Sequence, residues 1–82
     1  MDSNFDSVYN RILPLITRVL KRELQLQPDT VLQADVGMTS LQVMDLVLEI
    51  EEEFDISFPL NRLPDIQTIR DLTREIVIRL DQ

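Results

Sequence analysis

Residues 39–54 read TSLQVMDLVLEIEEEF, a stretch that predicts an α-helix with a well-defined start. Thr39 followed by Gln42 fits the capping box, in which each side chain bonds the backbone N–H of the other residue. The helix should continue to the end of this stretch, where residues 55–59, DISFP, break it. We therefore expect Ser40 to be the first residue inside the helix.

The apolar side chains of this helix fall into two groups on a wheel of roughly 100° per residue. The group predicted to face the core comprises Val43, Leu46, Val47, Ile50 and Phe54. The other group, about a third of a turn or more away, comprises Leu41, Met44 and Leu48 and is bordered by Asp45, Glu49 and Glu52. An apolar strip with an acidic rim is the composition of a docking surface for a partner with a basic rim and an apolar centre. The competing interpretation is that the bundle wraps further round the helix and buries this second group as core.

Two further long helices are predicted, one on each side of this helix in the sequence. Apolar residues recur at three- and four-residue steps over most of residues 4–24, and Pro14 inside that stretch predicts a kink or a break. The last helix should begin after Thr68, with Asp71 at the matching capping-box position. Its predicted core face consists of Ile69, Leu72, Ile76 and Leu80.

The segments between the helices carry turn residues. Residues 25–38 lose the helical period but keep scattered apolar residues, which predicts a long loop attached to the core, and long loops tend to be functional. Residues 60–63 predict one short helical turn, which Pro64-Asp65 should end. Three long helices and one short one, with no strand pattern, predict an all-α fold, a four-helix bundle.

The composition excludes several classes of protein. Eighty-two residues make a single small domain, residues 1–82, and its core must be aliphatic because Trp is absent and aromatic residues are only 5%. The chain has no Cys and no His, which excludes disulfides, Cys–His and Ser–His–Asp enzymes and nearly every structural zinc pattern. With Gly37 as its only glycine, it can form neither a dinucleotide fingerprint nor a P-loop. We expect no catalytic residues, no metal and no enzymatic activity.

The chain is acidic, with a formal net charge of −7 at pH 7. Most of the acidic residues lie in residues 23–60, which contain no Lys or Arg. This sign repels phosphodiester backbones and anionic lipids, so we expect no nucleic-acid partner and no membrane insertion. Residues 1–10 lack the features of a signal peptide, and we expect a monomeric, cytoplasmic protein.

Ser40 is a candidate for carrying an attached or bound phosphate. The first residue of a helix lies beside unpaired backbone N–H groups and the positive end of the helix dipole, an environment that favours an attached or bound phosphate. The competing interpretation is that Thr39-Ser40 is only a helix cap.

An ordered set of short motifs resembles a known family. The set consists of Gly37-Met38-Thr39-Ser40-Leu41, then Glu51-Glu52-Glu53-Phe54-Asp55, then Phe58-Pro59, and then Ile66-Gln67-Thr68-Ile69. It resembles a stand-alone, type II acyl carrier protein, in which a G-x-D-S-L motif presents a serine that receives 4′-phosphopantetheine. The resemblance runs from about residue 29 to the C-terminus.

This resemblance implies a four-helix bundle in which Ser40 carries a covalent 4′-phosphopantetheine arm. It implies a carrier that presents acyl groups as thioesters to enzymes of fatty-acid, polyketide or lipid biosynthesis. The implied partners are a phosphopantetheinyl transferase and acyl-loading and acyl-processing enzymes with basic docking patches. The residues implied to meet them are Leu41, Met44, Asp45, Leu48, Glu49 and Glu52.

Two residues depart from the family pattern. Thr39 stands where the family usually has Asp, and Gln42 stands where it commonly has an acid. Both keep the capping box and remove a carboxylate beside Ser40, so we expect a specialised carrier. Two alternatives remain: an aminoacyl or peptidyl carrier, and an interaction module that is never modified.

Overall fold

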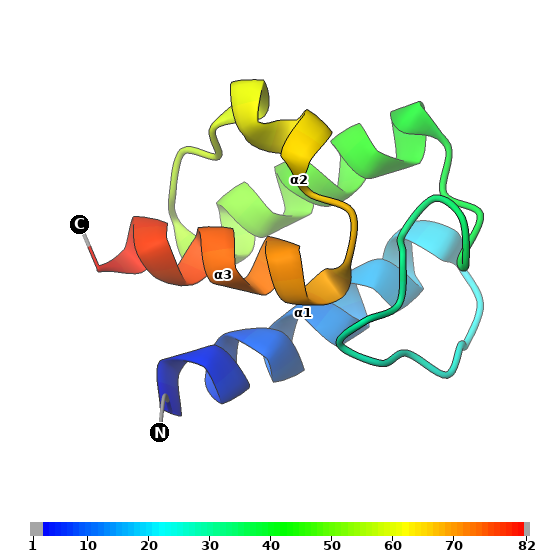
Figure 1. Ribbon diagram of the computed structural model, residues 1–82, viewed down its shortest axis with the longest axis horizontal. Coiled ribbons are helices and arrows are strands. Elements are labelled where there is room, and N and C mark those ends of the chain that lie inside the picture. Colours follow the sequence, from blue (N-terminus) through cyan, green and yellow to red (C-terminus); the bar gives the residue numbers. More distant parts are fainter. Residues whose placement is uncertain (1–2, 82) are drawn as a thin grey trace.

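The computed structural model describes residues 3–81 and contains three α-helices and one 3-10 helix (Figure 1). The elements are α1, Ser3–Leu20; α2, Ser40–Phe54; η1, Leu60–Asp65; and α3, Ile69–Leu80. Within the described residues the only β-type pairing is an isolated bridge between Val31 and Thr68. The predicted all-α bundle of three long helices and one short one is confirmed.

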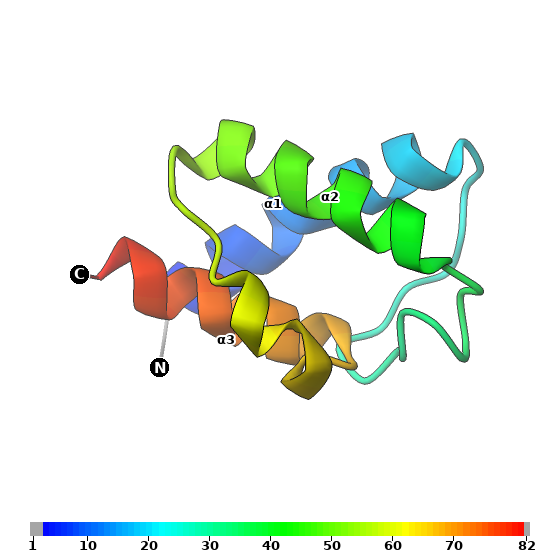
Figure 2. The ribbon, with the colours of Figure 1, turned by 90° about the horizontal axis from the view of Figure 1, so that it is seen from above.

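α1 makes the close helix–helix contacts of the bundle, with α2 on one side and α3 on the other. In Figures 1 and 2, η1 lies beside α2 and α3, on the side away from α1. The side chains that fill the centre are almost all aliphatic, and the most deeply buried are Ile12, Ile16, Leu46, Ile50, Ile69, Leu72 and Ile76. The core is therefore aliphatic, as the composition predicts.

α1 runs through Pro14 without a break. The proline removes the backbone bond to the carbonyl of Asn10, but both residues are exposed, so water can take that bond while Ile12 and Ile16 stay buried on the opposite face. The prediction of a break is wrong, and a kink stays a prediction. The prediction of a helix over most of residues 4–24 is confirmed. α1 ends at Leu20 because Lys21 adopts a left-handed conformation with φ 59°, which turns the chain into the loop.

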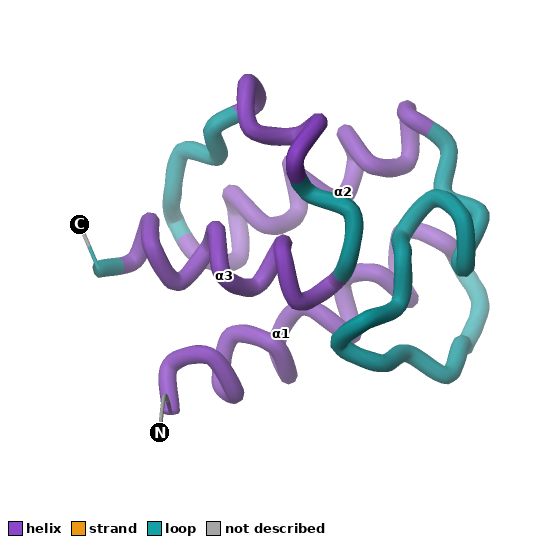
Figure 3. The backbone as a smooth tube through the Cα atoms, viewed as in Figure 1, coloured by secondary structure: helices purple, strands orange, loops and turns teal. Residues whose placement is uncertain are grey.

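The long loop lies at one end of the bundle, where Figure 3 shows it in teal, and it is hydrogen-bonded to the start of α3. The N–H of Leu32 donates to the carbonyl of Gln67 at 2.9 Å, and the N–H of Ile69 donates to the carbonyl of Thr30 at 3.1 Å. Arg70 adds an ion pair with Asp29 at 3.0 Å. The predicted attached loop is confirmed, and these bonds hold it against the beginning of α3.

The two apolar groups of α2 have different environments. Leu46, Val47, Ile50 and Phe54 are buried, whereas Val43, predicted to be core, is only half-buried. The second group is exposed, with Leu41 at 72%, Leu48 at 58% and Met44 at 37%. The competing interpretation, in which the bundle buries this group, is therefore wrong.

The last third of the chain corrects two expectations. Pro64-Asp65 was expected to end the short helix, but η1 continues through Pro64 to Asp65. The fixed φ of proline is compatible with a short 3-10 helix. In α3, Ile69 is buried as predicted, but Leu80 is 42% exposed. Leu80 is the last residue of α3, so no further turn of this helix lies beyond it to cover the side chain.

The predicted capping box of α3 is present, with the N–H of Asp71 donating to Thr68 Oγ1 at 3.0 Å. Burial alone would raise the pKa of Asp71, but hydrogen bonds from the backbone N–H groups of Gln67 and Thr68, the Thr68 side chain and the charge of Arg74 hold it below its ordinary value. The ionised carboxylate thus stabilises the folded chain.

We expect Asp71→Asn to lower the free energy of unfolding by roughly 1 kcal/mol at neutral pH, since the amide accepts the same bonds without charge. A carboxyl whose folded pKa is depressed contributes stability above its unfolded pKa of about 3.9, and loses it as pH falls through the lower folded value. Urea unfolding of the wild type and of Asp71→Asn between about pH 2.5 and 7 measures this pH dependence. The difference between them should be constant above about pH 5 and shrink below about pH 4; a difference independent of pH would contradict it.

Candidate attachment site and docking face

Ser40 is the first residue of α2 and is exposed. The capping box before it is complete, because the N–H of Gln42 donates to Thr39 Oγ1 at 3.1 Å and the N–H of Thr39 donates to Gln42 Oε1 at 3.0 Å. These bonds leave the backbone N–H groups of Ser40 and Leu41 without a partner among the described residues. The capping box therefore fixes the start of the helix at Ser40 without using the Ser40 hydroxyl.

The chain leading to Ser40 is anchored by hydrogen bonds to the long loop. Gly37 has φ 80°, a left-handed conformation that glycine adopts without strain, and its N–H donates to the carbonyl of Gln33 at 3.1 Å. The next residue, Met38, is buried, and its N–H donates to the carbonyl of Leu32 at 3.1 Å. Ser40 therefore follows a buried anchor by two residues, which restricts how far it can move.

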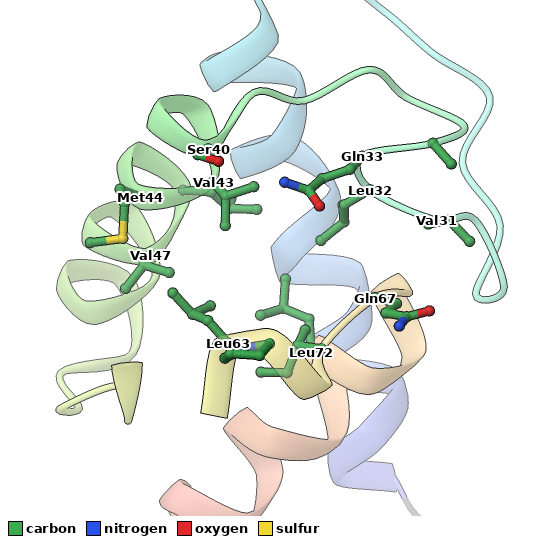
Figure 4. A pocket seen from close by; sticks show the side chains of 14 residues that line it. Val31, Leu32, Gln33, Ser40, Val43, Met44, Val47, Leu63, Gln67 and Leu72 are labelled. Atoms are coloured by element: carbon green, nitrogen blue, oxygen red, sulfur yellow. The ribbon is translucent and has the colours of Figure 1, made fainter. Parts of the chain in front are cut away.

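A cavity of about 450 Å³ opens beside Ser40, between α2, the long loop, η1 and the start of α3 (Figure 4). Its volume lies in the lower half of the range that small-molecule sites occupy. Its walls are mainly aliphatic side chains, including Leu32, Val43, Val47, Leu63, Ile66 and Leu72. Three polar residues line it, namely Gln33, Ser40 and Gln67. A group attached at Ser40 would begin at the mouth of an apolar space.

The predicted docking residues are distributed over two faces of α2. Leu41, Met44 and Leu48 lie three and four positions apart on one outward face, and Asp45 and Glu52 are exposed. Glu49 instead forms an ion pair with Arg18 of α1 at 2.7 Å. The structure thus brings the three apolar residues together and engages one of the three predicted acids within the bundle.

Sequence reasoning missed a cluster of charges that holds η1 against α3. The carboxylate of Glu75 is buried and pairs with Arg62 of η1 at 3.4 Å and with Arg79 at 3.3 Å. The spacing of Glu75 and Arg79 is a signal for a helix pair, but nothing in the sequence indicates the contact with Arg62. Since η1 supplies Leu63 to the cavity wall, this cluster supports that wall.

None of the helices in the described part of the chain is long and apolar enough to cross a membrane.

Comparison with known proteins agrees with this geometry. Residues 10–76 match the family described as the phosphopantetheine attachment site. The matched family and the fold are those of a phosphopantetheine-dependent carrier domain. The chain belongs to the acyl carrier protein family, whose cofactor is 4′-phosphopantetheine, and its role is that of a carrier.

Individual relatives cover nearly the whole chain. A probable acyl carrier protein of Caulobacter vibrioides is 34% identical over 76 residues, which is 93% of this chain and 88% of the relative. Aminoacyl carrier protein 1 of Bradyrhizobium diazoefficiens is 33% identical, covering 89% of this chain and 86% of the relative. Among solved structures, a putative acyl carrier protein from Mycobacterium tuberculosis has a TM-score of 0.82 at 28% identity, over 87% of this chain and 96% of that one.

Proposed function

We propose that Ser40 carries the 4′-phosphopantetheine arm of a monomeric, cytoplasmic acyl carrier formed by the single domain of residues 1–82. The observation that carries this proposal is the position of Ser40, exposed at the first residue of α2 and at the mouth of an apolar cavity. The chain itself performs no catalysis in this proposal; partner enzymes act on the cargo, and the chain attaches it, presents it and shelters it.

The residues around Ser40 fit a phosphodiester. The unpaired N–H groups of Ser40 and Leu41 and the positive end of the α2 dipole favour negative charge there. When bound, the group supplies a terminal thiol on which an acyl chain is held as a thioester.

The attachment reaction is a phosphoryl-type transfer from coenzyme A to Ser40. The hydroxyl oxygen of Ser40 forms a bond to the phosphorus that bears the pantetheine, and the pyrophosphate bond breaks to release adenosine 3′,5′-bisphosphate. The hydroxyl proton leaves to a base of the transferase, since the chain has no histidine to receive it.

The exposed face of α2 is the proposed meeting surface for the transferase and the acyl-processing enzymes. Leu41, Met44 and Leu48 form its apolar centre, and the exposed carboxylates Asp45 and Glu52 form its rim. Because Glu49 is paired with Arg18, it contributes less charge to a partner than the other two acids. Contacts of this kind are fast and sensitive to salt, as suits a shuttle.

An aminoacyl carrier is the second candidate. The observation that favours it is the similarity to the aminoacyl carrier protein of Bradyrhizobium diazoefficiens. The two candidates differ in which donor loads the holo form: an acyl-transferring enzyme for the first, and an adenylating ligase with an amino acid for the second.

Incubation with coenzyme A and a broad-specificity phosphopantetheinyl transferase tests the proposal. Intact-mass measurement should show a gain of one phosphopantetheine group, and fragmentation of the modified peptide should place that mass on Ser40. A folded chain that gains no mass with any of several transferases would favour the unmodified interaction module.

The residue before Ser40 should control the rate of this loading. We expect Thr39→Asp to raise kcat/KM for a broad-specificity transferase roughly tenfold, because it adds a carboxylate beside the modified serine and Asp caps a helix as well as Thr does. Steady-state loading at two salt concentrations measures this. Thr39→Ser, which keeps the cap without the charge, is the control, and an equal gain in both variants would contradict the electrostatic explanation.

A further inference from the structure

Gln33 is one of the three polar residues that line the otherwise apolar cavity. In Figure 4 it extends from the loop toward α2, in the direction of Val43 and of Ser40, whereas the side chain of Gln67 points away from α2. Gln33 is exposed, and its carboxamide has no hydrogen-bond partner among the described residues, although its backbone carbonyl accepts from Gly37.

In this position the Gln33 carboxamide would contact a cargo that is attached through Ser40 and enters the cavity. In the empty cavity, water can satisfy both the N–H groups and the carbonyl of the amide. A chain of methylene groups that displaces this water leaves the amide unpaired, which is unfavourable. A chain with a hydroxyl or carbonyl oxygen at the same depth replaces the water, so the amide distinguishes the two kinds of cargo.

We infer that Gln33 is a specificity-determining residue and that the cavity takes acyl chains bearing an oxygen near the thioester, such as 3-hydroxyacyl or 3-oxoacyl groups, in preference to fully saturated chains. This inference rests on the proposed attachment at Ser40, because that attachment brings the cargo to the cavity mouth. The remaining lining is apolar and suits the rest of the chain.

The test compares octanoyl and 3-hydroxyoctanoyl groups loaded on Ser40 from their coenzyme A thioesters. The rate of thioester cleavage by hydroxylamine, divided by the rate for the same thioester on free coenzyme A, measures how well each cargo is sheltered. We expect the 3-hydroxyoctanoyl group to be sheltered roughly tenfold better, the factor expected when an amide gains or loses one hydrogen bond. The side-chain NH₂ signals of Gln33 in an NMR spectrum should differ between the two cargoes, since the amide keeps a hydrogen bond with one and loses it with the other.

Gln33→Leu should reduce the preference to about one while keeping the backbone bond to Gly37. Gln25→Leu, the same change at an exposed loop residue that does not line the cavity, should leave the preference unchanged. Equal sheltering of both cargoes by the wild type would overturn the inference. So would an equal loss of sheltering for both cargoes in Gln33→Leu, which would mean that Gln33 binds the arm and not the cargo.

Failure of the attachment can be separated from failure of the inference. Because the chain contains no cysteine, Ser40→Cys provides a single thiol that accepts, without any transferase, an iodoacetamide derivative of either chain joined through a spacer as long as the phosphopantetheine arm. Gln33 NH₂ signals that differ between the two chains would support the cavity preference even if Ser40 were never modified enzymatically. The same signals unmoved by both chains would overturn it.

Discussion

Ser40→Ala is expected to gain no mass with coenzyme A and any phosphopantetheinyl transferase that loads the wild type. The loss should be complete, since the substitution removes the one oxygen to which the phosphorus is joined. The fold should be unaffected: Ser40 is exposed, the cap is formed by Thr39 and Gln42, and alanine is the best helix former. Intact-mass measurement with circular dichroism on the same samples checks both statements.

Ser57→Ala is the matched control for this experiment. Ser57 is also exposed, but it lies in the irregular segment between α2 and η1 and not at a helix start. It should gain mass at the wild-type rate. A full gain of mass by Ser40→Ala would show that the arm is attached elsewhere and would refute the assignment of Ser40.

Local sequence rules predict the features of this structure that depend on residues close together in the chain. Both capping boxes, Thr39 with Gln42 and Thr68 with Asp71, are closed as predicted, because a cap depends on residues three positions apart. The buried stripe of α2 follows from the helical period in the same way. These local features are sufficient to predict Ser40 at the start of a helix.

The parts that local rules missed depend on contacts between segments far apart in the sequence. The end of α1 at Leu20 coincides with a hydrogen bond from Arg22 to the carbonyl of Val36, 14 residues away. The pairing of Glu49 with Arg18 spans 31 residues and removes one predicted docking acid from the free surface. No periodicity within one helix contains such information.

The sequence does not predict the cavity either, because its walls come from segments far apart in the chain. Its walls come from four segments, and the loop wall is held in place by backbone bonds from Leu32 to Gln67 and from Ile69 to Thr30. Gln33 looked like an ordinary polar loop residue, and only its direction toward α2 makes it a candidate for cargo recognition.

Leu48→Arg is expected to lower kcat/KM for loading by the transferase by about 10- to 100-fold. Leu48 is 58% exposed in the apolar centre of the α2 face, so the substitution replaces apolar contact with a charge of the same sign as the partner's basic rim. The stability of the chain should change little, because an exposed helix position tolerates arginine. Initial rates of mass gain over a range of carrier concentrations measure the effect.

Ile78→Arg separates a specific docking face from a general change in charge. Ile78 is 48% exposed on α3, so the two variants make the same chemical change at comparable exposure on different helices. Ile78→Arg should load within about twofold of the wild type, because added charge far from the contact acts only through the screened long-range field. Raising the salt concentration should slow wild-type loading, since it screens the attraction of Asp45 and Glu52 to the basic rim. Equal defects in both arginine variants would mean that α2 is not the docking surface and that net charge alone governs loading.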